Sequence, residues 1–276
     1  MTAPPSPDVP WSLKGKTAIV TGGSRGIGRA IAIHLARKGL AKLAITYATD
    51  LKAAEATLDE CRRLGIENAI AIQADALDPT FASKVVTQTL DGLETTAVDI
   101  LVNNAVLGDP NNFLPIENTT AEIFLRTMQA NVYSPASLTA ALIPHLPAYG
   151  GRVINISSVL GIQGNPDPNF TYGASKAALQ SFTRSFAATF AKTTQATFNS
   201  VVVGLTDTDA FRSARYMMPP GHLEEHIRNV TAAERIGVPD DVAYIVGFLS
   251  SEESRWVNGA AISANGGDRL ALGALG

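Results

Sequence analysis

Short apolar runs alternate with amphipathic segments along most of the chain. The apolar runs have the length and composition of β-strands, and they predict strands at residues 17–22, 43–47, 69–75, 98–105, 152–158, 198–204 and 260–267. Helical periodicity separates them, at residues 26–38 and 51–64, through Asn131 to about Leu146, around Tyr172, and from Asp240 to Leu249. Pro79 is expected in the first turn of the helix after the third strand. The alternation predicts an α/β fold: a doubly wound parallel sheet with helices on both faces.

The pattern contains no internal repeat and no interdomain linker. We therefore expect a flexible, proline-rich tail at residues 1–13 and a single catalytic domain at residues 14–276. The longest irregular region is residues 205–235, which we interpret as a lid over the substrate, partly helical at residues 222–230. The alternative is a loop that packs on its own protein. Its apolar residues are Phe211, Tyr216, Met217 and Met218.

Composition narrows the range of partners. Of the 276 residues, 46% are apolar and 17% charged, and the net charge is −3. That balance gives no reason to expect nucleic acid or an anionic membrane as a partner. Cys61 is the only cysteine, which rules out a disulfide within one chain and suits a reducing compartment. With neither a signal-peptide pattern nor an apolar stretch long enough to span a bilayer, we expect a cytoplasmic protein.

Three glycines lie between the first predicted strand and the first helix. In "TGGSRGIG", Gly22, Gly26 and Gly28 let the backbone turn tightly where free amides of a helix N-terminus attract phosphate groups. The alternative is a purely structural turn. The strand-turn-helix context favours a phosphate cradle.

The order of several motifs resembles that of the classical short-chain dehydrogenases/reductases. "TGGSRGIG", "NNA" (103–105), "YGASK" (172–176), "RIGVPDDVA" (235–243) and "NGG" (265–267) carry the resemblance, which runs from about Lys14 to Asp268. The resemblance implies a Rossmann-like fold, a nicotinamide cofactor and a homotetramer or homodimer, with residues 177–190 as a contact surface. It implies that the cofactor is held by Gly22, Ser24, Arg25, Gly26, Ile27, Gly28, Tyr47, Ala48, Thr49, Asp75, Asn104, Ala105, Tyr172, Lys176, Thr206 and Thr208.

The end of the second strand favours NADP(H). An acidic residue there would hydrogen-bond a ribose 2′-hydroxyl, but the strand ends in Tyr47, Ala48 and Thr49. Arg25 in the glycine turn is suited to a 2′-phosphate, with a solvated charge as the alternative. Asp50 is an alternative partner for the ribose. Asp75 resembles the family's adenine-edge residue, with a helix N-cap as the alternative.

Tyr172 and Lys176 lie one helical turn apart, so both can face one side of a helix. A nearby cation favours the phenolate, so we expect a lowered tyrosine pKa and an acid/base group. Ser157 and Ser158 end the fifth strand, where a hydroxyl can polarise a substrate carbonyl. The resemblance implies that Ser158 has this role and that Ser157 is structural. The resemblance implies that Asn131 holds a water that relays protons to the lysine. These four catalytic residues, Asn131, Ser158, Tyr172 and Lys176, predict an NADPH-dependent ketoreductase.

The substrate is less constrained. Leu107, Leu160 and Phe170 indicate an apolar pocket for a ring or medium chain, and the lid loosely resembles that of fungal naphthol reductases, which suggests secondary metabolism. Two alternatives remain: oxidation of a secondary alcohol, and a redox-silent scaffold or isomerase. The resemblance implies that Val106, Val203 and Thr206 replace family residues near the nicotinamide, and Val106 and Thr206 motivate the second alternative.

Three further features of the sequence contribute little to the functional prediction. Arg212 and Arg215 are suited to an acidic substrate, but we favour surface solvation. His222 and His226 have helical metal spacing without a third ligand, so no metal is expected. No nucleophile elbow surrounds Ser158, which argues against a hydrolase.

Overall fold

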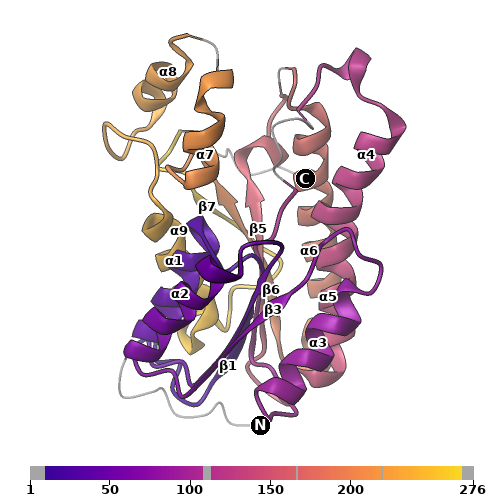
Figure 1. Cartoon of the computed structure of the whole chain (residues 1–276), viewed down its shortest axis with the longest axis vertical. Helices are drawn as coiled ribbons and strands as arrows, with labels where there is room; N and C mark the ends of the chain where they lie inside the picture. The colour runs from indigo at the N-terminus through magenta and orange to yellow at the C-terminus, as the bar shows by residue number, and fades with distance from the viewer. Residues whose placement is uncertain (1–9, 108–112, 166, 219, 269–276) are drawn as a thin grey trace.

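Seven parallel strands form one sheet in the order β3-β2-β1-β4-β5-β6-β7 (Figure 1). The computed structural model describes residues 10–107, 113–165, 167–218 and 220–268. The strands are β1 (Thr17–Val20), β2 (Lys42–Tyr47), β3 (Asn68–Gln73), β4 (Ile100–Asn103), β5 (Arg152–Ser158), β6 (Thr197–Val203) and β7 (Ala261–Ala264). The predicted doubly wound parallel sheet is confirmed.

Helices cover both faces of the sheet. They are α1 (Gly26–Arg37), α2 (Leu51–Arg63), α3 (Phe81–Gly92), α4 (Ala121–Met128), α5 (Ser134–Leu142), α6 (Phe170–Thr194), α7 (Asp209–Ala214), α8 (His222–Asn229) and α9 (Pro239–Ser250). Figure 1 shows α1, α2 and α9 on one face and α3, α5 and α6 on the other. Short 3-10 turns are η2 (Ile116–Asn118), η4 (Ile143–His145), η5 (Val159–Gly161), η6 (Arg215–Met217) and η7 (Glu252–Ser254).

Successive residues along a strand point alternately into two apolar cores, one on each face of the sheet. On β1, Ala18 and Val20 join the core beneath α1 and α9, while Ile19 joins the core beneath α3 and α6. The same alternation holds on β4, where Leu101 faces the second core. Burial on both faces explains why these strands are almost wholly apolar.

The polypeptide changes direction between β1 and β4. From β1 the chain adds β2 and then β3 on one side of the sheet, and from β4 it adds β5, β6 and β7 on the other side. This reversal of strand order leaves a crevice at the carboxyl ends of β1 and β4. Ser158 ends β5 in register with Val203 at the end of β6, so both residues lie at this carboxyl edge. The fold therefore places the predicted catalytic and glycine-turn residues at one edge of the sheet.

Several local expectations need correction. The predicted continuous helix around Asn131 is interrupted by a π-helical turn, η3 (Gln129–Tyr133), between α4 and α5. Pro79 precedes α3 rather than occupying its first turn, because α3 begins at Phe81. The tail boundary at residue 13 is too late, since Leu13 is 1% exposed within a core. Within the described residues, no helix combines the length and hydropathy needed to cross a bilayer.

Candidate active site

The ends of β1 and β4 are fastened to each other. Thr21 Oγ1 accepts hydrogen bonds from the backbone amides of Asn104 at 2.9 Å and Ala105 at 3.0 Å. In return, Asn104 Nδ2 donates to the carbonyls of Thr21 at 2.9 Å and Gly22 at 3.1 Å. The Asn104 side chain therefore shapes the glycine turn, and Ala105 continues the same edge.

The glycine turn requires its glycines for distinct reasons. Gly22 and Gly26 have φ values of 63° and 54°, in the left-handed region that side chains disfavour. A Cβ added to Gly28 would collide with the carbonyl oxygen of Gly22. Gly28 is therefore needed for the close approach of α1 to the end of β1, as expected for a phosphate cradle.

The N-terminus of α1 has no protein cap. Its N-cap residue, Arg25, makes no side-chain capping bond, and the first turn carries no acidic residue. The amides at this end are thus available to an anion, and the helix dipole favours negative charge there. Thr208 borders the same space, because a Cβ on Gly26 would lie 3.5 Å from its methyl group. These residues fit the phosphates of a dinucleotide.

The end of β2 carries no available carboxylate. Tyr47 is buried and ends the strand, and Ala48 and Thr49 are exposed beyond it. Asp50, the alternative ribose partner, is the N-cap of α2, and its carboxylate accepts from the Ala53 amide at 2.9 Å. The exposed Arg25 side chain makes no hydrogen bond or ion pair within the described residues, so it is available to a phosphate.

The other predicted cofactor residues have varied surroundings. Ser24 is half-buried, and Ile27 packs against the first core. Asp75 is exposed and accepts from the Leu77 amide at 2.9 Å, which closes a turn after β3 rather than capping α3. Thr206 is buried, and its hydroxyl donates to the Gly204 carbonyl at 3.0 Å. Thr208 caps α7 by accepting from the Phe211 amide.

The predicted catalytic residues of β5 and α6 come together. Lys176 Nζ donates to the Ile156 carbonyl at 2.9 Å and lies 5.6 Å from the centroid of the Tyr172 ring. Ser158, at the end of β5, lies close enough to the Tyr172 phenol to act on its pKa, and its Oγ accepts from the Leu160 amide at 3.2 Å. Ser157 instead accepts from Gln180 Nε2 at 2.8 Å in the interior, as expected for a structural residue.

Burial controls both titrating groups. It raises the pKa of Tyr172 to about 12, and the hydrogen bond with Ser158 acts in the lowering direction without offsetting this. The expectation that Lys176 lowers the tyrosine pKa in this structure is therefore wrong. Burial also lowers the pKa of Lys176 to about 8, because a charged ammonium is poorly solvated there.

Asn131 connects the site to the neighbouring loop. It lies buried in the π-helical turn η3, a feature common at functional sites. Its Oδ1 accepts from the Leu107 amide at 2.8 Å, and its Nδ2 donates to Ser175 Oγ at 3.3 Å. Ser175 Oγ in turn donates to the Tyr172 carbonyl at 2.7 Å. Asn131 is thus joined to the helix turn that carries the tyrosine.

Two residues near Tyr172 are not indicated by the sequence pattern. The Phe113 ring lies 5.4 Å from the Tyr172 ring, centroid to centroid. The Asp167 carboxylate accepts from the Ile116 amide at 3.1 and 3.2 Å, which ties the segment after Phe113 to the start of α6. Both residues lie in irregular segments, where no periodicity indicates which side chains meet.

Residues 205–235, which the sequence predicts as a lid, contain the helices α7 and α8, and Figure 1 shows both beyond the carboxyl ends of the strands. The α7 helix was not expected. Arg212 pairs with Asp207 and Asp209, so its charge is compensated and the acidic-substrate interpretation is not supported. His226 Nδ1 lies 3.2 Å from Oδ2 of the buried Asp268, whereas no metal-binding cluster occurs in the described part of the chain.

Val106 and Val203, which differ from the pattern of the family, lie in different environments. Val106 is 44% exposed at the end of β4, whereas Val203 is 7% exposed at the end of β6. Val203 is therefore a core residue, and only Val106 presents a large apolar surface to solvent. Their effect on turnover stays a prediction.

Comparison with known proteins agrees with this geometry. A family model described as enoyl-(acyl carrier protein) reductase matches residues 22–268. The chain belongs to the short-chain dehydrogenase/reductase family. It is 60% identical over 266 residues to a short chain dehydrogenase of Penicillium thymicola, with 96% of each chain covered. The expected family resemblance is confirmed, and with it the assignment as an oxidoreductase.

Two further members of the family are informative. A hydroxynaphthalene reductase of Aspergillus fumigatus is 33% identical over 262 residues, with 91% of each chain covered. The crystal structure of a short chain dehydrogenase from Burkholderia cenocepacia in complex with NADP matches with a TM-score of 0.80 at 36% identity. That match covers 93% of this chain and 98% of the other.

Proposed function

We propose that this short-chain dehydrogenase/reductase is an NADPH-dependent reductase of secondary metabolism. Its substrate is a ketone of medium size with apolar or aromatic character. The observation that carries the proposal is the position of Lys176, which donates to the Ile156 carbonyl of β5 at 2.9 Å and lies 5.6 Å from the centroid of the Tyr172 ring, with Ser158 at the end of the same strand. That arrangement offers a donor for a carbonyl oxygen and an acid for its proton.

Each residue has a defined task. Ser158 orients the carbonyl, and the Tyr172 hydroxyl donates a proton to its oxygen. Lys176 contributes positive charge close to the tyrosine, and Asn131 keeps the turn of α6 and the loop at Leu107 in place. The bound dinucleotide would supply the hydride.

The titration behaviour favours reduction over alcohol oxidation. Reduction requires a protonated phenol, whereas oxidation requires a phenolate as the base. With a pKa of about 12, Tyr172 retains its proton throughout the physiological range. Oxidation would therefore need a larger electrostatic contribution from the bound, positively charged ring.

Several observations support NADP(H) as the cofactor. Arg25 is exposed and available beside the uncapped N-terminus of α1. Asp50 is engaged as the cap of α2, so no carboxylate at the end of β2 is positioned to repel a 2′-phosphate. The NADP complex of the Burkholderia cenocepacia relative supports the same choice.

The substrate class rests on apolar side chains around Tyr172. The Phe113 ring lies against the tyrosine, and the Phe170 side chain is 41% exposed at the start of α6. Aromatic rings pack favourably in offset or edge-to-face contacts with such groups. The hydroxynaphthalene reductase of Aspergillus fumigatus supports an aromatic, polycyclic ketone.

The test is turnover of NADPH with a panel of cyclic and aromatic ketones, run in parallel with NADP⁺ and the matching alcohols. We expect ketone-dependent loss of NADPH absorbance, and a loss of activity of about 10²–10⁴-fold in Tyr172→Phe. The exposed Tyr133→Phe is the matched control and should retain activity. Tight NADPH binding without turnover on any ketone would instead favour a redox-silent scaffold.

We also propose a homo-oligomer that uses the outer face of α6. Phe182 on α6 is 44% exposed, and Phe124 and Leu125 on α4 are 43% and 63% exposed. The two helices contact each other, so their outer faces form one apolar surface suited to a second copy. Sedimentation velocity of Phe182→Glu should show a smaller species than the unmodified protein.

A further inference from the structure

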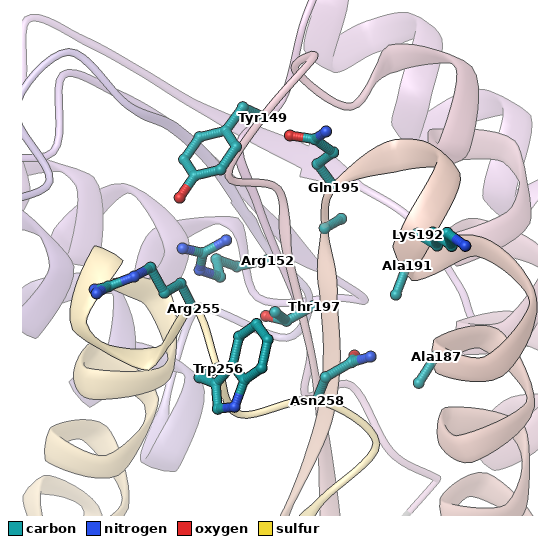
Figure 2. A pocket seen from close by; sticks show the side chains of 11 residues that line it. Tyr149, Arg152, Ala187, Ala191, Lys192, Gln195, Thr197, Arg255, Trp256 and Asn258 are labelled. Carbon is teal, nitrogen blue, oxygen red and sulfur yellow. The ribbon is translucent and has the colours of Figure 1, made fainter. Parts of the chain in front are cut away.

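A cavity lies at the edge of the sheet where the strands begin, opposite to the edge that carries Ser158. It has a volume of about 590 Å³ and is lined where β5 and β6 begin, by the last turns of α6, and by residues 255–258 (Figure 2). The seven residues of β5 separate its Arg152 end from Ser158. At about 3.3 Å per residue, the two places are roughly 20 Å apart. The cavity is therefore separate from the candidate active site.

The cavity has one aromatic wall and one flat wall. Trp256 is 96% exposed, so its indole is almost fully hydrated in the isolated chain. Figure 2 shows Ala187 and Ala191 of α6 across the cavity from this ring. Small side chains leave a smooth apolar surface there. A planar apolar group between the two walls would remove hydrated surface from both.

Positive charge exceeds negative charge around this space. Lys192, Arg255 and Arg152 line the cavity, and Lys192 makes no ion pair within the described residues. The facing carboxylate is Glu252, which accepts from Tyr149 Oη at 2.6 Å and from Arg152 Nη2 at 3.1 Å. Arg255 Nε is 3.9 Å from the same carboxylate. Figure 2 shows Arg255 beside Trp256 and Lys192 on α6, on opposite sides of the cavity, so each retains capacity for an anion at its own rim.

A polar group in the cavity wall lacks a partner. Thr197 is 7% exposed, and its Oγ1 makes no hydrogen bond within the described residues. In the view of Figure 2, this hydroxyl lies between the side chains of Arg152 and Trp256. Buried hydroxyls are normally satisfied, so this one calls for a polar atom from an occupant of the cavity.

We propose that this cavity binds a planar aromatic carboxylate. The ring packs against the Trp256 indole and the α6 wall, and the carboxylate faces Arg255, which lies on the same side of the cavity as the indole. The volume falls in the range of small-molecule sites, roughly 300–1,000 Å³. The ligand binds independently of the dinucleotide, because the cavity and the glycine turn lie at opposite edges of the sheet.

The experiment uses 2-naphthoate as the probe and Trp256 as the reporter. The chain has two tryptophans, so Trp11→Phe leaves Trp256 as the only one. We expect saturable quenching with a Kd on the order of 0.1 mM, unchanged by saturating NADPH. In the same background, Arg255→Gln and Arg255→Ala should each weaken binding at least tenfold. The matched control, Arg63→Gln on α2, removes an exposed cation far from the cavity and should have no effect.

Two measurements distinguish a built carboxylate site from unspecific adsorption of an apolar ring. The neutral probe 2-naphthylmethanol should bind at least tenfold more weakly than 2-naphthoate, and calorimetry should show naphthoate binding lost in Trp256→Ala. Equal binding of both probes, or no effect of the charge substitutions, would overturn the proposal. A buried-type emission from Trp256, with a smaller sedimenting species in Trp256→Ala, would show instead that a second copy covers this surface.

Discussion

Lys176 Nζ is held at 2.9 Å by the carbonyl of Ile156, two residues before Ser158, while the Tyr172 ring centroid lies 5.6 Å away. The ammonium is therefore positioned by the strand that carries the serine rather than by the tyrosine. Its burial, at 3% exposure, carries an energetic cost because the ammonium is removed from water. Such a cost is typical of residues retained for function.

Removal of this charge should stabilise the fold. Lys176 has a pKa of about 8 instead of 10.5, and each unit corresponds to about 1.4 kcal/mol. After subtraction of about 1 kcal/mol for the lost hydrogen bond, Lys176→Met should raise the unfolding free energy at neutral pH by about 2 kcal/mol. Urea unfolding measures this change. The exposed Lys192→Met is the control and should change little.

The same pKa shift predicts a pH dependence of stability. The folded lysine releases its proton at about pH 8 and the unfolded one at 10.5, so the unfolded chain binds more protons between these values. Stability attributable to Lys176 therefore rises as pH increases through this interval. Unfolding curves across the interval should show a rise in the unmodified protein that is absent from Lys176→Met. A rise of equal size in both would contradict the assignment.

The reductive rate should fall on the alkaline side. Tyr172 keeps its proton up to a pKa of about 12, so the phenol does not limit reduction near neutrality. Lys176 loses its charge above about pH 8. We therefore expect kcat/KM for ketone reduction to be level below this value and to decline above it. The profile is measured with NADPH saturating, and a decline that begins on the acidic side would argue for a different acid.

Arg25 should decide between the two nicotinamide cofactors. Loss of a charge-assisted hydrogen bond costs about 1.5–3 kcal/mol, so Arg25→Ala should raise the KM for NADPH about tenfold to 100-fold. The KM for NADH should remain within about twofold, because NADH has no 2′-phosphate to contact. Arg29→Ala, also exposed on α1, is the matched control. An equal loss with both cofactors would indicate damage to the glycine turn.

The contact between His226 and Asp268 should hold α8 in place. Every residue of α8 is at least partly exposed, so the 3.2 Å contact with a buried carboxylate is a principal attachment. A hydrogen bond contributes about 1 kcal/mol, so His226→Phe should speed amide exchange in α8 about threefold to tenfold. His222→Phe replaces the neighbouring imidazole, for which the described residues show no carboxylate contact, and is the control. Exchange unchanged in both variants would remove this attachment from the lid.

The regular parts of the fold could be predicted because their signals are local. Apolar runs such as "VDILV" and the periodicity of α1 and α9 follow directly from burial, and the glycine turn follows from φ values that only glycine adopts easily. The π-helical turn at Asn131 could not be predicted, because it depends on a contact with Leu107 from another segment.

In the candidate site too, some residues could be predicted from the sequence and others could not. Residues at strand ends and within the Tyr172 helix can be identified from spacing, since both positions are fixed by regular geometry. The raised tyrosine pKa cannot, because it depends on how much protein surrounds the phenol, which spacing does not reveal. Phe113 and Thr197 are not predictable either, because their neighbours lie far away in sequence.

The hydrogen bond from the Ile116 amide to the Asp167 carboxylate also affects how easily the site can be changed to accept a larger substrate. It links two stretches of chain that are fifty-one positions apart, one shortly after Phe113 and one shortly before α6. A bulkier molecule that pushes on one stretch must displace both. Variants designed to make room for a larger substrate should therefore change residues on both sides of this link.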